Sequence, residues 1–310
     1  MPDLVICEFM DQAAVDGLQK DFDLHYDPDL VDKPDELLKL VADARALIVR
    51  NRTQVRGALL EAGTSLMVIG RLGVGLDNID LVTCATRNIE VCPASGANDD
   101  PVAEYVIAMM LVLLRGGFQA TASVIAGDWP RQACIGREVA GKQLGLVGFG
   151  GIARNVAARA RNLGMTIAAY DPFLPAENPA WKDCEKLELG ALLGACDVIS
   201  LHVPLSDATR NLLDAPAIAG MKKRAVVINT ARGGVIDEHA LAEALKKGAL
   251  GGAAIDVYAT EPVTADSGKL FAGVPNLFLT PHIAGVTEEA NVRVSGVTAD
   301  NVRRVLEKAS

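Results

Sequence analysis

Short apolar runs alternate with amphipathic helical patterns along the whole chain. In the first hundred residues these runs are residues 4–7, 46–49, 66–69 and 89–92. Each run is apolar or nearly apolar throughout, which is typical of strands that are covered on both faces. Helical patterns such as residues 35–44 separate the runs. This alternation predicts a parallel α/β sheet.

A second set of strand-like runs begins after Gly141. Its members are residues 143–147, 166–170, 197–201, 225–229, 252–257 and 277–279. Six strands with helices between them are typical of a doubly wound, dinucleotide-binding sheet. The sequence therefore predicts an α/β protein with two Rossmann-like domains, each built on a parallel sheet.

Two further helices are predicted outside these alternating units. In residues 99–114, Asp99 or Asp100 can cap a helix and Pro101 suits its first turn. This helix is apolar on nearly all sides, so we expect it to be buried between domains or against another subunit. Residues 288–308 form the other helical pattern, which we expect to pack back on the first domain.

The composition supports a protein with sizeable buried cores. The chain has 310 residues, of which 50% are hydrophobic and 22% are charged, and its formal net charge is -9. This length favours two domains, and the apolar fraction argues against disorder. The acidic balance argues against nucleic acid as a partner, because phosphates need clustered Lys and Arg. It does not exclude an anionic substrate, since a local pair of arginines can outweigh a diffuse negative field.

Neither a secretory signal nor a membrane span is recognisable. The longest apolar run, residues 102–114, is interrupted by Glu104 and is shorter than the ~20 residues that cross a bilayer. The cysteines are scattered and form no Cys-x-x-Cys pair, which favours reduced thiols in a cytoplasm, and no metal site is expected. They are Cys7, Cys84, Cys92, Cys134, Cys184 and Cys196.

A glycine-rich turn follows the first strand of the second set. The pattern Gly148-x-Gly150-x-x-Ala153 is the alanine-ended form of the dinucleotide fingerprint. Gly148 permits the tight turn, Gly150 lets backbone amides approach a pyrophosphate, and Ala153 allows close packing of helix on strand. The start of the following helix offers free N–H groups and the positive end of its dipole.

Asp171 closes the next strand, 23 residues after Gly148. An acidic residue at this distance can accept hydrogen bonds from ribose hydroxyls and would repel a 2′-phosphate. No Arg or Lys in residues 172–175 could hold that phosphate. We therefore expect NAD rather than NADP, although Asp171 could also serve only as a turn cap.

Three polar residues follow predicted strands of the second sheet, at the edge where such sheets bind ligands. They are Arg232, Glu261 and His282. An arginine offers a fork of donors to carboxylate and carbonyl oxygens, and a histidine side chain exchanges protons near neutral pH. A nearby Glu would orient the imidazole. Together they suit hydride transfer at a 2-hydroxy or 2-oxo acid, although each alone has a structural explanation.

With these motifs in place, the chain resembles the D-isomer-specific 2-hydroxyacid dehydrogenase family. The similarity covers essentially the whole chain, and the motifs together are highly specific. One departure is Gly151, which stands where many relatives carry Arg. Glu261 argues against the related formate dehydrogenase branch, which uses Gln there. The matching stretches are residues 70–80, 148–153, 202–205, 229–234, 256–262 and 280–285.

The resemblance implies a set of roles and a domain layout. Arg232, Glu261 and His282 would be catalytic, and Val74 and Gly75 would offer backbone amides to the substrate carboxylate. The substrate domain would comprise residues 1–97 and 286–310, with the NAD-binding domain, residues 98–285, inserted between them. The helix after Asp99 resembles the family's dimer-forming segment, so a homodimer is expected. The implied cofactor-binding residues are Gly148, Gly150, Gly151, Ile152, Asp171, Val203, Pro204, Thr209, Thr230, Ala231, Arg232, Asp256, His282 and Gly285.

The substrate's tail is the least determined part of the prediction. Arg50, Arg52 and Arg71 follow predicted strands of the first domain and could hold a second anionic group. They could instead pair with acidic neighbours such as Asp77. This arginine-rich loop and residues 8–11 resemble family members that act on (S)-sulfolactate. Arg50 and Arg52 are thus predicted to bind substrate, together with Arg232 and His282.

Other functions fit the same features. Within the family, 3-phosphoglycerate and hydroxypyruvate or glyoxylate are alternative substrates. An NAD-sensing, corepressor-like binding protein could retain the same residues, and the glycine-rich turn could serve a methyltransferase. The acidic charge favours the enzyme over the corepressor.

Overall fold

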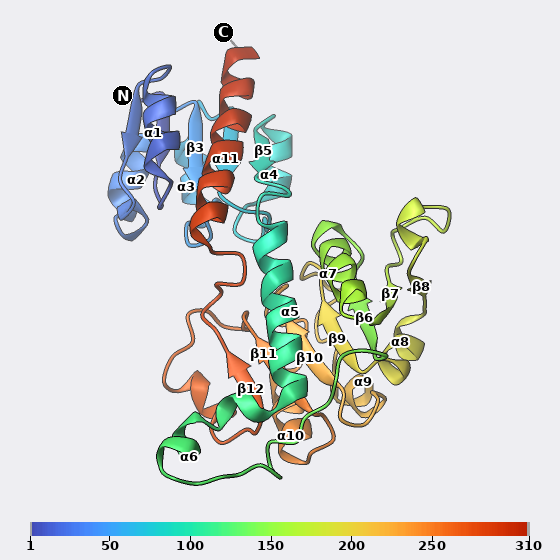
Figure 1. Ribbon diagram of the computed structural model, residues 1–310. Coiled ribbons are helices and arrows are strands. Elements are labelled where there is room, and N and C mark those ends of the chain that lie inside the picture. Colours follow the sequence, from blue (N-terminus) through green and yellow to red (C-terminus); the bar gives the residue numbers. More distant parts are fainter. Residues whose placement is uncertain (1, 309–310) are drawn as a thin grey trace. The chain divides into compact units, whose positions relative to one another are not determined.

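The computed structural model describes residues 2–308 and divides the chain into two compact units. Unit 1 comprises residues 1–98 and 286–310 of the chain, and unit 2 comprises residues 99–285. Figure 1 shows both units, coloured along the sequence. Unit 2 is thus inserted into unit 1, in agreement with the predicted fold class.

Unit 1 is built on a parallel sheet of five strands in the order β2-β1-β3-β4-β5. The sequence pattern identified four of these strands and missed β2, whose side chains are only partly buried. The strands are β1 (Leu4–Ile6), β2 (Leu24–Tyr26), β3 (Ala46–Val49), β4 (Val68–Arg71) and β5 (Glu90–Pro93). The helices are α1 (Gln12–Gln19), η1 (Leu30–Asp32), α2 (Pro34–Val41), α3 (Ala58–Ala62), α4 (Leu81–Thr86) and α11 (Glu288–Lys308).

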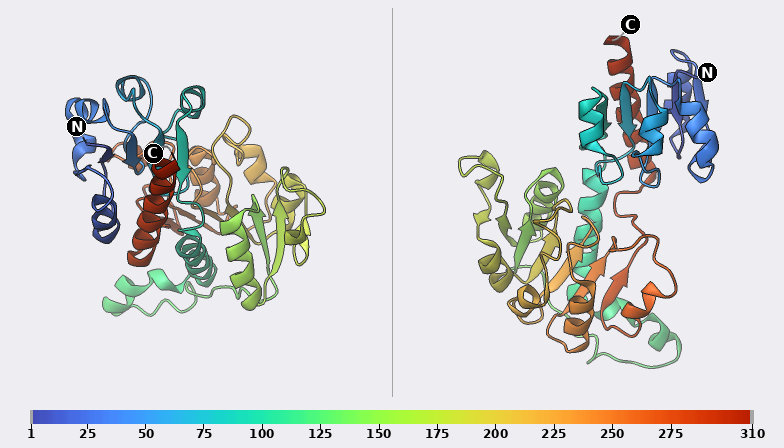
Figure 2. Two further views of the ribbon diagram at one scale, coloured as in Figure 1. Left: turned by 90° about the horizontal axis from the view of Figure 1, so that it is seen from above. Right: turned by 180° about the vertical axis from the view of Figure 1, so that it is seen from behind.

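Helices cover both faces of this sheet, as Figure 2 shows. One core contains residues of α1 and α11, and the other contains residues of α2 and α3. The close approach of α11 depends on Gly70 in β4, because a methyl group there would lie 2.7 Å from Val302 and 2.9 Å from Thr298. The last helix therefore packs on the first domain, as its pattern predicted.

Unit 2 contains a parallel sheet of seven strands in the order β12-β11-β10-β9-β6-β7-β8. The six predicted strands are present, and β8 is an additional short, exposed edge strand. The strands are β6 (Gln143–Val147), β7 (Thr166–Tyr170), β8 (Glu185–Lys186), β9 (Val198–Leu201), β10 (Val226–Asn229), β11 (Gly252–Ile255) and β12 (Leu277–Leu279). The helices are α5 (Asp99–Arg115), η2 (Gly117–Gln119), α6 (Thr121–Ile125), α7 (Gly151–Asn162), η3 (Pro179–Trp181), α8 (Leu189–Ala195), α9 (Ala215–Ala219), α10 (Glu238–Lys246) and η4 (Ser267–Phe271).

The order of strands in unit 2 reverses between β6 and β9. From β6 the chain builds outward through β7 and β8, and it then returns to build β9 to β12 on the other side. Helices α5 and α7 contribute to the core on one face, and α8, α9 and α10 contribute to the core on the other. Ligands of such sheets bind beyond the carboxyl ends of the strands at this reversal point. Among residues 2–308, no helix is long and apolar enough to cross a membrane.

Candidate active site

The glycine-rich turn lies at the carboxyl end of β6, next to the reversal point. Gly148 has a φ of +87°, and a side chain there would meet the carbonyl oxygen of His202 at 2.5 Å. Only glycine satisfies both conditions. A methyl group on Gly150 would meet no atom within 4 Å, so the turn is open at this residue. Gly150 caps α7 without a side-chain hydrogen bond, which leaves the first N–H groups of that helix free.

Asp171 ties the end of β7 to this turn. Its Oδ2 accepts a hydrogen bond from the N–H of Phe149 at 2.9 Å, and its Oδ1 accepts from the N–H groups of Phe173 and Leu174 at 3.0 and 3.2 Å. The carboxylate therefore does cap a local turn. Since a carboxylate offers about four acceptor positions, Oδ2 keeps capacity for a further donor.

The loop after β9 forms the other side of the turn. His202 hydrogen-bonds through Nε2 to Ser200 Oγ at 2.9 Å, and desolvation lowers the pKa of its imidazole to about 4. This ring is consequently neutral at physiological pH. Further along the loop, Thr209 Oγ1 donates to the carbonyl oxygen of Pro204 at 2.6 Å and accepts from the N–H of Ser206 at 2.8 Å. The loop is thus held in shape by its own side chains.

Arg232 is presented by the loop that follows β10. The buried amide of Asn229 holds this loop, because its Nδ2 donates to the carbonyl of Arg232 at 2.9 Å and its Oδ1 accepts from Ala231 N–H at 3.0 Å. A side chain on Gly233 would lie 1.7 Å from the carbonyl oxygen of Tyr258. Only glycine permits this approach between the loops that carry Arg232 and Glu261.

Glu261 and His282 form a direct pair. His282 Nδ1 lies 2.8 Å from Glu261 Oε2, and Glu261 Oε1 accepts the N–H of Tyr258 at 2.9 Å. Burial alone would raise the pKa of Glu261, but the hydrogen bonds from His282 and Tyr258 and the charges of His282 and Arg232 outweigh it. The pKa of Glu261 is therefore lowered, and the carboxylate stays ionised beside the imidazole.

A buried network holds the loop that carries His282. Asp256 is 1% exposed, and its carboxylate accepts N–H groups from Ile283 and Ala284 at 2.8 Å each. Thr280 Oγ1 donates to the same carboxylate at 2.5 Å and hydrogen-bonds to Tyr105 OH on α5 at 2.7 Å. His282 itself has a φ of +56°, a conformation that non-glycine residues seldom adopt. The network fixes the loop in which this conformation occurs.

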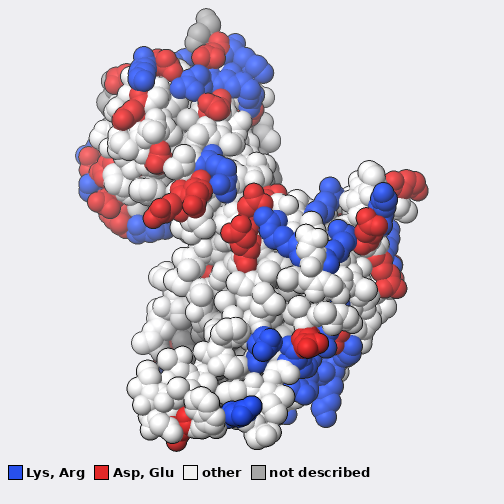
Figure 3. Space-filling view, in the orientation of Figure 1, with Lys and Arg blue, Asp and Glu red and all other residues white. Residues whose placement is uncertain are grey.

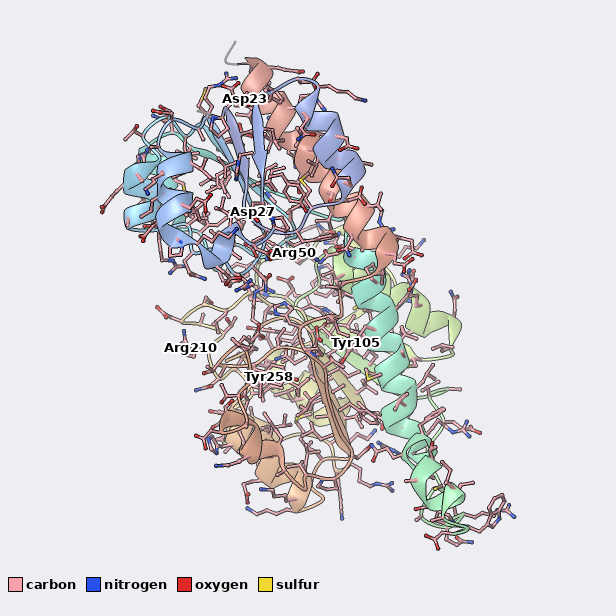
Figure 4. The ribbon with its side chains drawn as sticks, turned by 90° about the vertical axis from the view of Figure 1, so that its left-hand side faces the viewer. Asp23, Asp27, Arg50, Tyr105, Arg210 and Tyr258 are labelled. Atoms are coloured by element: carbon pink, nitrogen blue, oxygen red, sulfur yellow. The ribbon has the colours of Figure 1, made fainter. Side chains whose placement is uncertain are left out.

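Tyr258 adds a second support to the same loop. Its single hydroxyl proton is shared between the carbonyl oxygens of Thr280 and Ile255, which lie 2.9 and 3.1 Å away. Figure 4 labels Tyr105 and Tyr258, which extend toward this loop from α5 and from the segment after β11. The imidazole is therefore anchored from two elements that are distant in the sequence.

In unit 1 a buried carboxylate organises the loop after β3. Glu8 is 4% exposed and accepts backbone N–H groups from Arg50 at 2.8 Å, Arg52 at 3.1 Å and Thr53 at 3.0 Å. Asn78 closes the loop from the other side by donating to the carbonyl of Thr53 at 2.7 Å. The backbone of this loop is thus held from two sides, and its side chains remain to contact other groups.

The arginines of unit 1 have different surroundings. Arg50, labelled in Figure 4, hydrogen-bonds to Asn291 at 3.0 Å and stacks over Phe9 at 5.9 Å. Desolvation lowers the pKa of Arg50 in spite of the nearby charge of Glu8. Arg52 is exposed and pairs with Asp32 through two contacts, so this arginine has an acidic neighbour as its partner.

Arg71 and the glycines after β4 complete the candidate residues of unit 1. The Arg71 side chain folds back, because its Nη1 donates to the carbonyl oxygen of Leu72 at 2.7 Å. It covers Gly73, where an added methyl group would lie 1.8 Å from Nη1. Val74 is 38% exposed, and Gly75 is half-buried. Arg71 therefore shapes its own loop.

Known proteins resemble the chain over nearly its full length. Residues 107–284 match the family model described as D-isomer specific 2-hydroxyacid dehydrogenase, NAD binding domain. The chain is 53% identical over 307 residues to the (S)-sulfolactate dehydrogenase of Chromohalobacter salexigens, with 99% of each chain covered. The chain belongs to the D-isomer-specific 2-hydroxyacid dehydrogenase family. It is an NAD-dependent oxidoreductase that acts on the CH–OH group of a small 2-hydroxy acid.

Two other relatives show how far this similarity extends. The hydroxypyruvate reductase of Thermotoga maritima is 39% identical over 285 residues, which are 92% of each chain. A solved structure of the D-lactate dehydrogenase from Aquifex aeolicus, complexed with NAD and lactic acid, superimposes with a TM-score of 0.86 at 26% identity. That comparison covers 98% of this chain and 97% of the other.

The residues of this dehydrogenase fit an NAD molecule at the end of β6. The turn is open at Gly150, and the first turn of α7 has no side-chain cap. At the end of β10, Thr230 Oγ1 is buried and has no hydrogen-bond partner within residues 2–308. An orphaned hydroxyl at a ligand-binding edge is readily explained by a bound polar group.

Sequence reasoning missed several residues that hold the site. Tyr105 lay within a helix predicted only from its apolar pattern, and its hydroxyl is the one polar group that reaches Thr280 from α5 in the described chain. The signal that could have found it is a tyrosine amid aliphatic residues, since a buried phenol needs a hydrogen-bond partner. The backbone contacts of Glu8 were also missed, because they depend on the meeting of β1 and β3.

Proposed function

We propose that His282 is the acid/base of this dehydrogenase, with Glu261 as its orienting partner and Arg232 as the group that binds the substrate's carboxylate and carbonyl oxygens. The observation that best supports this proposal is the 2.8 Å contact between His282 Nδ1 and Glu261 Oε2. This contact leaves Nε2 as the nitrogen that faces away from Glu261. In the oxidative direction, Nε2 accepts the hydroxyl proton; in the reductive direction, it returns the proton to the carbonyl oxygen.

NAD supplies hydride transfer to or from C2 of the substrate. Gly150, Gly151 and Ile152 would hold the pyrophosphate with backbone N–H groups, and Asp171 would accept a hydrogen bond from a ribose hydroxyl. Gly148 would line the cofactor by permitting the tight turn, since its own N–H donates to the carbonyl oxygen of Tyr170 at 2.8 Å. Thr230 supplies its orphaned hydroxyl, while Asp256 shapes the loop at the nicotinamide end. The remaining cofactor contacts that we propose are Val203, Pro204, Thr209, Ala231, Arg232, His282 and Gly285.

The substrate that we propose is (S)-sulfolactate, with 3-sulfopyruvate as its oxidised form. The support comes from the 53% identity to the Chromohalobacter enzyme and from Arg50, which is partly desolvated and already oriented by Asn291 and Phe9. A desolvated guanidinium binds an oxyanion more strongly than a hydrated one. Arg52 contributes a second, exposed cation, and Val74 and Gly75 offer backbone N–H groups to the carboxylate.

The test is the rate of NADH oxidation with sulfopyruvate, hydroxypyruvate, phosphohydroxypyruvate and glyoxylate. We expect the highest kcat/KM with sulfopyruvate. A higher value with phosphohydroxypyruvate or hydroxypyruvate would replace the proposed substrate by 3-phosphoglycerate or glycerate. NADH binding without turnover of any 2-oxo acid would favour a nucleotide-sensing protein.

We also propose that the dehydrogenase is a homodimer formed through α5 and the segment that follows it. Residues of this segment expose large apolar side chains, and Figure 3 shows few charges over the region of α6. A patch of this kind marks an interaction surface. Sedimentation should give twice the mass of the chain, and Trp129→Glu should reduce it to one. The exposed residues are Phe118, Val124, Ile125, Trp129 and Ile135.

A cytoplasmic location completes the proposal. All six cysteines are free thiols, and four of them are buried. Burial raises the pKa of the Cys7 and Cys196 thiols to about 12 in each case, so both stay protonated and unreactive. Such thiols suit a reducing compartment.

A further inference from the structure

The space above Gly151 is filled by a carboxylate from another helix. A methyl group added to Gly151 would lie 2.4 Å from Oδ2 of Asp99, the first residue of α5. Gly151 is the first residue of α7, so this carboxylate lies beside the turn whose free N–H groups we assign to the pyrophosphate. The glycine at this position is what makes room for the acid.

No charged or polar side chain of the described residues is paired with Asp99. Its carboxylate has no hydrogen bond or ion pair within residues 2–308, whereas its neighbour Asp100 pairs with Arg159 at 2.8 Å. Arg154, the other nearby cation of α7, donates to the carbonyl oxygen of Phe149 at 2.9 Å. Desolvation, with a smaller contribution from the charge of Asp100, raises the pKa of Asp99. An anion that has no cationic partner repels a second anion that is brought close to it.

We propose that Asp99 sets the affinity for the dinucleotide by holding a negative charge beside the pyrophosphate-binding turn. The carboxylate competes with the pyrophosphate for the positive end of α7 and repels it. Asp99 thereby weakens the binding of NAD and NADH and speeds their release. Product release limits turnover in many enzymes, so a weakened complex with the cofactor favours rapid exchange. This inference rests on the proposed position of the pyrophosphate at α7.

The test is a fluorescence titration of the full-length protein with NADH, at low and at high salt. Asp99→Asn keeps the shape of the side chain and removes its charge. We expect the Kd for NADH to fall about twofold to fivefold, the range typical of a partly exposed charge interaction. The gain should shrink at high salt, because screening weakens the repulsion.

The matched control is Asp100→Asn, which removes the same charge one residue away from an exposed, paired side chain. Its effect on the Kd should be smaller than that of Asp99→Asn. Equal gains in the two variants would attribute the effect to net charge and overturn the proposal. An unchanged or raised Kd in Asp99→Asn would also overturn it. Asp99→Ser provides a second uncharged variant if the first unfolds on heating at a lower temperature than the wild type.

Gly151→Ala tests the contact itself. The added methyl group displaces the Asp99 carboxylate, so this variant should tighten NADH binding in the wild-type background. It should give no further gain in the Asp99→Asn background, and a gain of equal size in both backgrounds would contradict the displacement. Failure of the wild-type protein to bind NADH would contradict the proposed cofactor site. Normal binding with no effect at Asp99 would contradict this inference alone.

Discussion

Two loops of this dehydrogenase are organised in the same way but present different chemistry. In unit 2 the buried carboxylate of Asp256 receives two backbone N–H groups and one hydroxyl from the loop that carries His282. In unit 1 the buried carboxylate of Glu8 receives three N–H groups from the loop that carries Arg50 and Arg52. Each carboxylate fixes a backbone so that the neighbouring side chains are free to act.

The two loops differ in the partners that hold their functional side chains. His282 is engaged by Glu261, whose other oxygen is fixed by a backbone N–H, so its orientation is set within unit 2. Arg50 is held by an amide and an aromatic ring, and Arg52 by an exposed carboxylate. Neither interaction is specific to hydride transfer. We therefore expect the reaction to depend on the rigid set in unit 2, and the choice of substrate to depend on the more adaptable cations of unit 1.

Replacing His282 should have the largest effect, and this effect should be on the rate of the reaction. Because general acid/base catalysis contributes about 10²–10⁴-fold, His282→Ala should lower kcat by a factor in that range. The Kd for NADH should change little. Steady-state rates and a fluorescence titration measure the two effects, and a near-normal kcat would remove His282 from the mechanism.

Replacing Arg50 should weaken the binding of a substrate that carries a second anionic group. Arg50→Gln should raise the KM for sulfopyruvate about tenfold to a hundredfold and leave glyoxylate nearly unaffected, since only the former carries a second anion. Arg52→Gln is the control, with a smaller effect expected because Asp32 already neutralises that exposed charge. A larger effect at Arg52, or equal effects on both substrates, would contradict the assignment of Arg50.

Glu8→Gln should weaken the hydrogen bonds that hold the loop after β3, while Arg50 and Arg52 keep their side chains. An amide cannot accept all three N–H groups, and an unsatisfied buried donor costs about 1–3 kcal/mol. We expect the free energy of unfolding to fall by that amount, as followed by urea denaturation. The KM for sulfopyruvate should rise as the KM for glyoxylate stays constant. A loss of stability with no change in either KM would make Glu8 purely structural.

The smallest expected effect is on the free energy of unfolding at acidic pH, and it comes from Glu261. The folded chain lowers the pKa of Glu261, so the unfolded chain binds more protons as the pH falls. The stabilisation is complete above the ordinary carboxyl pKa of about 4.3 and is lost as the pH falls through the lower folded value. The difference in stability between the wild type and Glu261→Gln should shrink as the pH falls below about 4.3. A difference that is independent of pH would show that the ionised pair with His282 adds no stability.

The sequence by itself determined the α/β class, the two parallel sheets, the insertion of one domain and the reaction class. Apolar runs need no partner to be recognised as buried strands, and the glycine-rich turn is a local pattern. The sequence pattern did not reveal β2 and β8, because strands at the edge of a sheet that are partly or fully exposed lack this apolar signal.

Only the tertiary structure decided which groups meet. The pairing of Arg52 with Asp32, the reach of Tyr105 to Thr280 and the position of Asp99 over Gly151 join residues 20, 175 and 52 positions apart. Side-chain contacts of this kind depend on how helices and strands pack, which a pattern along one chain does not encode. For this reason the candidate residues of the reaction, including Glu261 beside His282, could be proposed from sequence, whereas the contacts that hold their loops were found only in the fold.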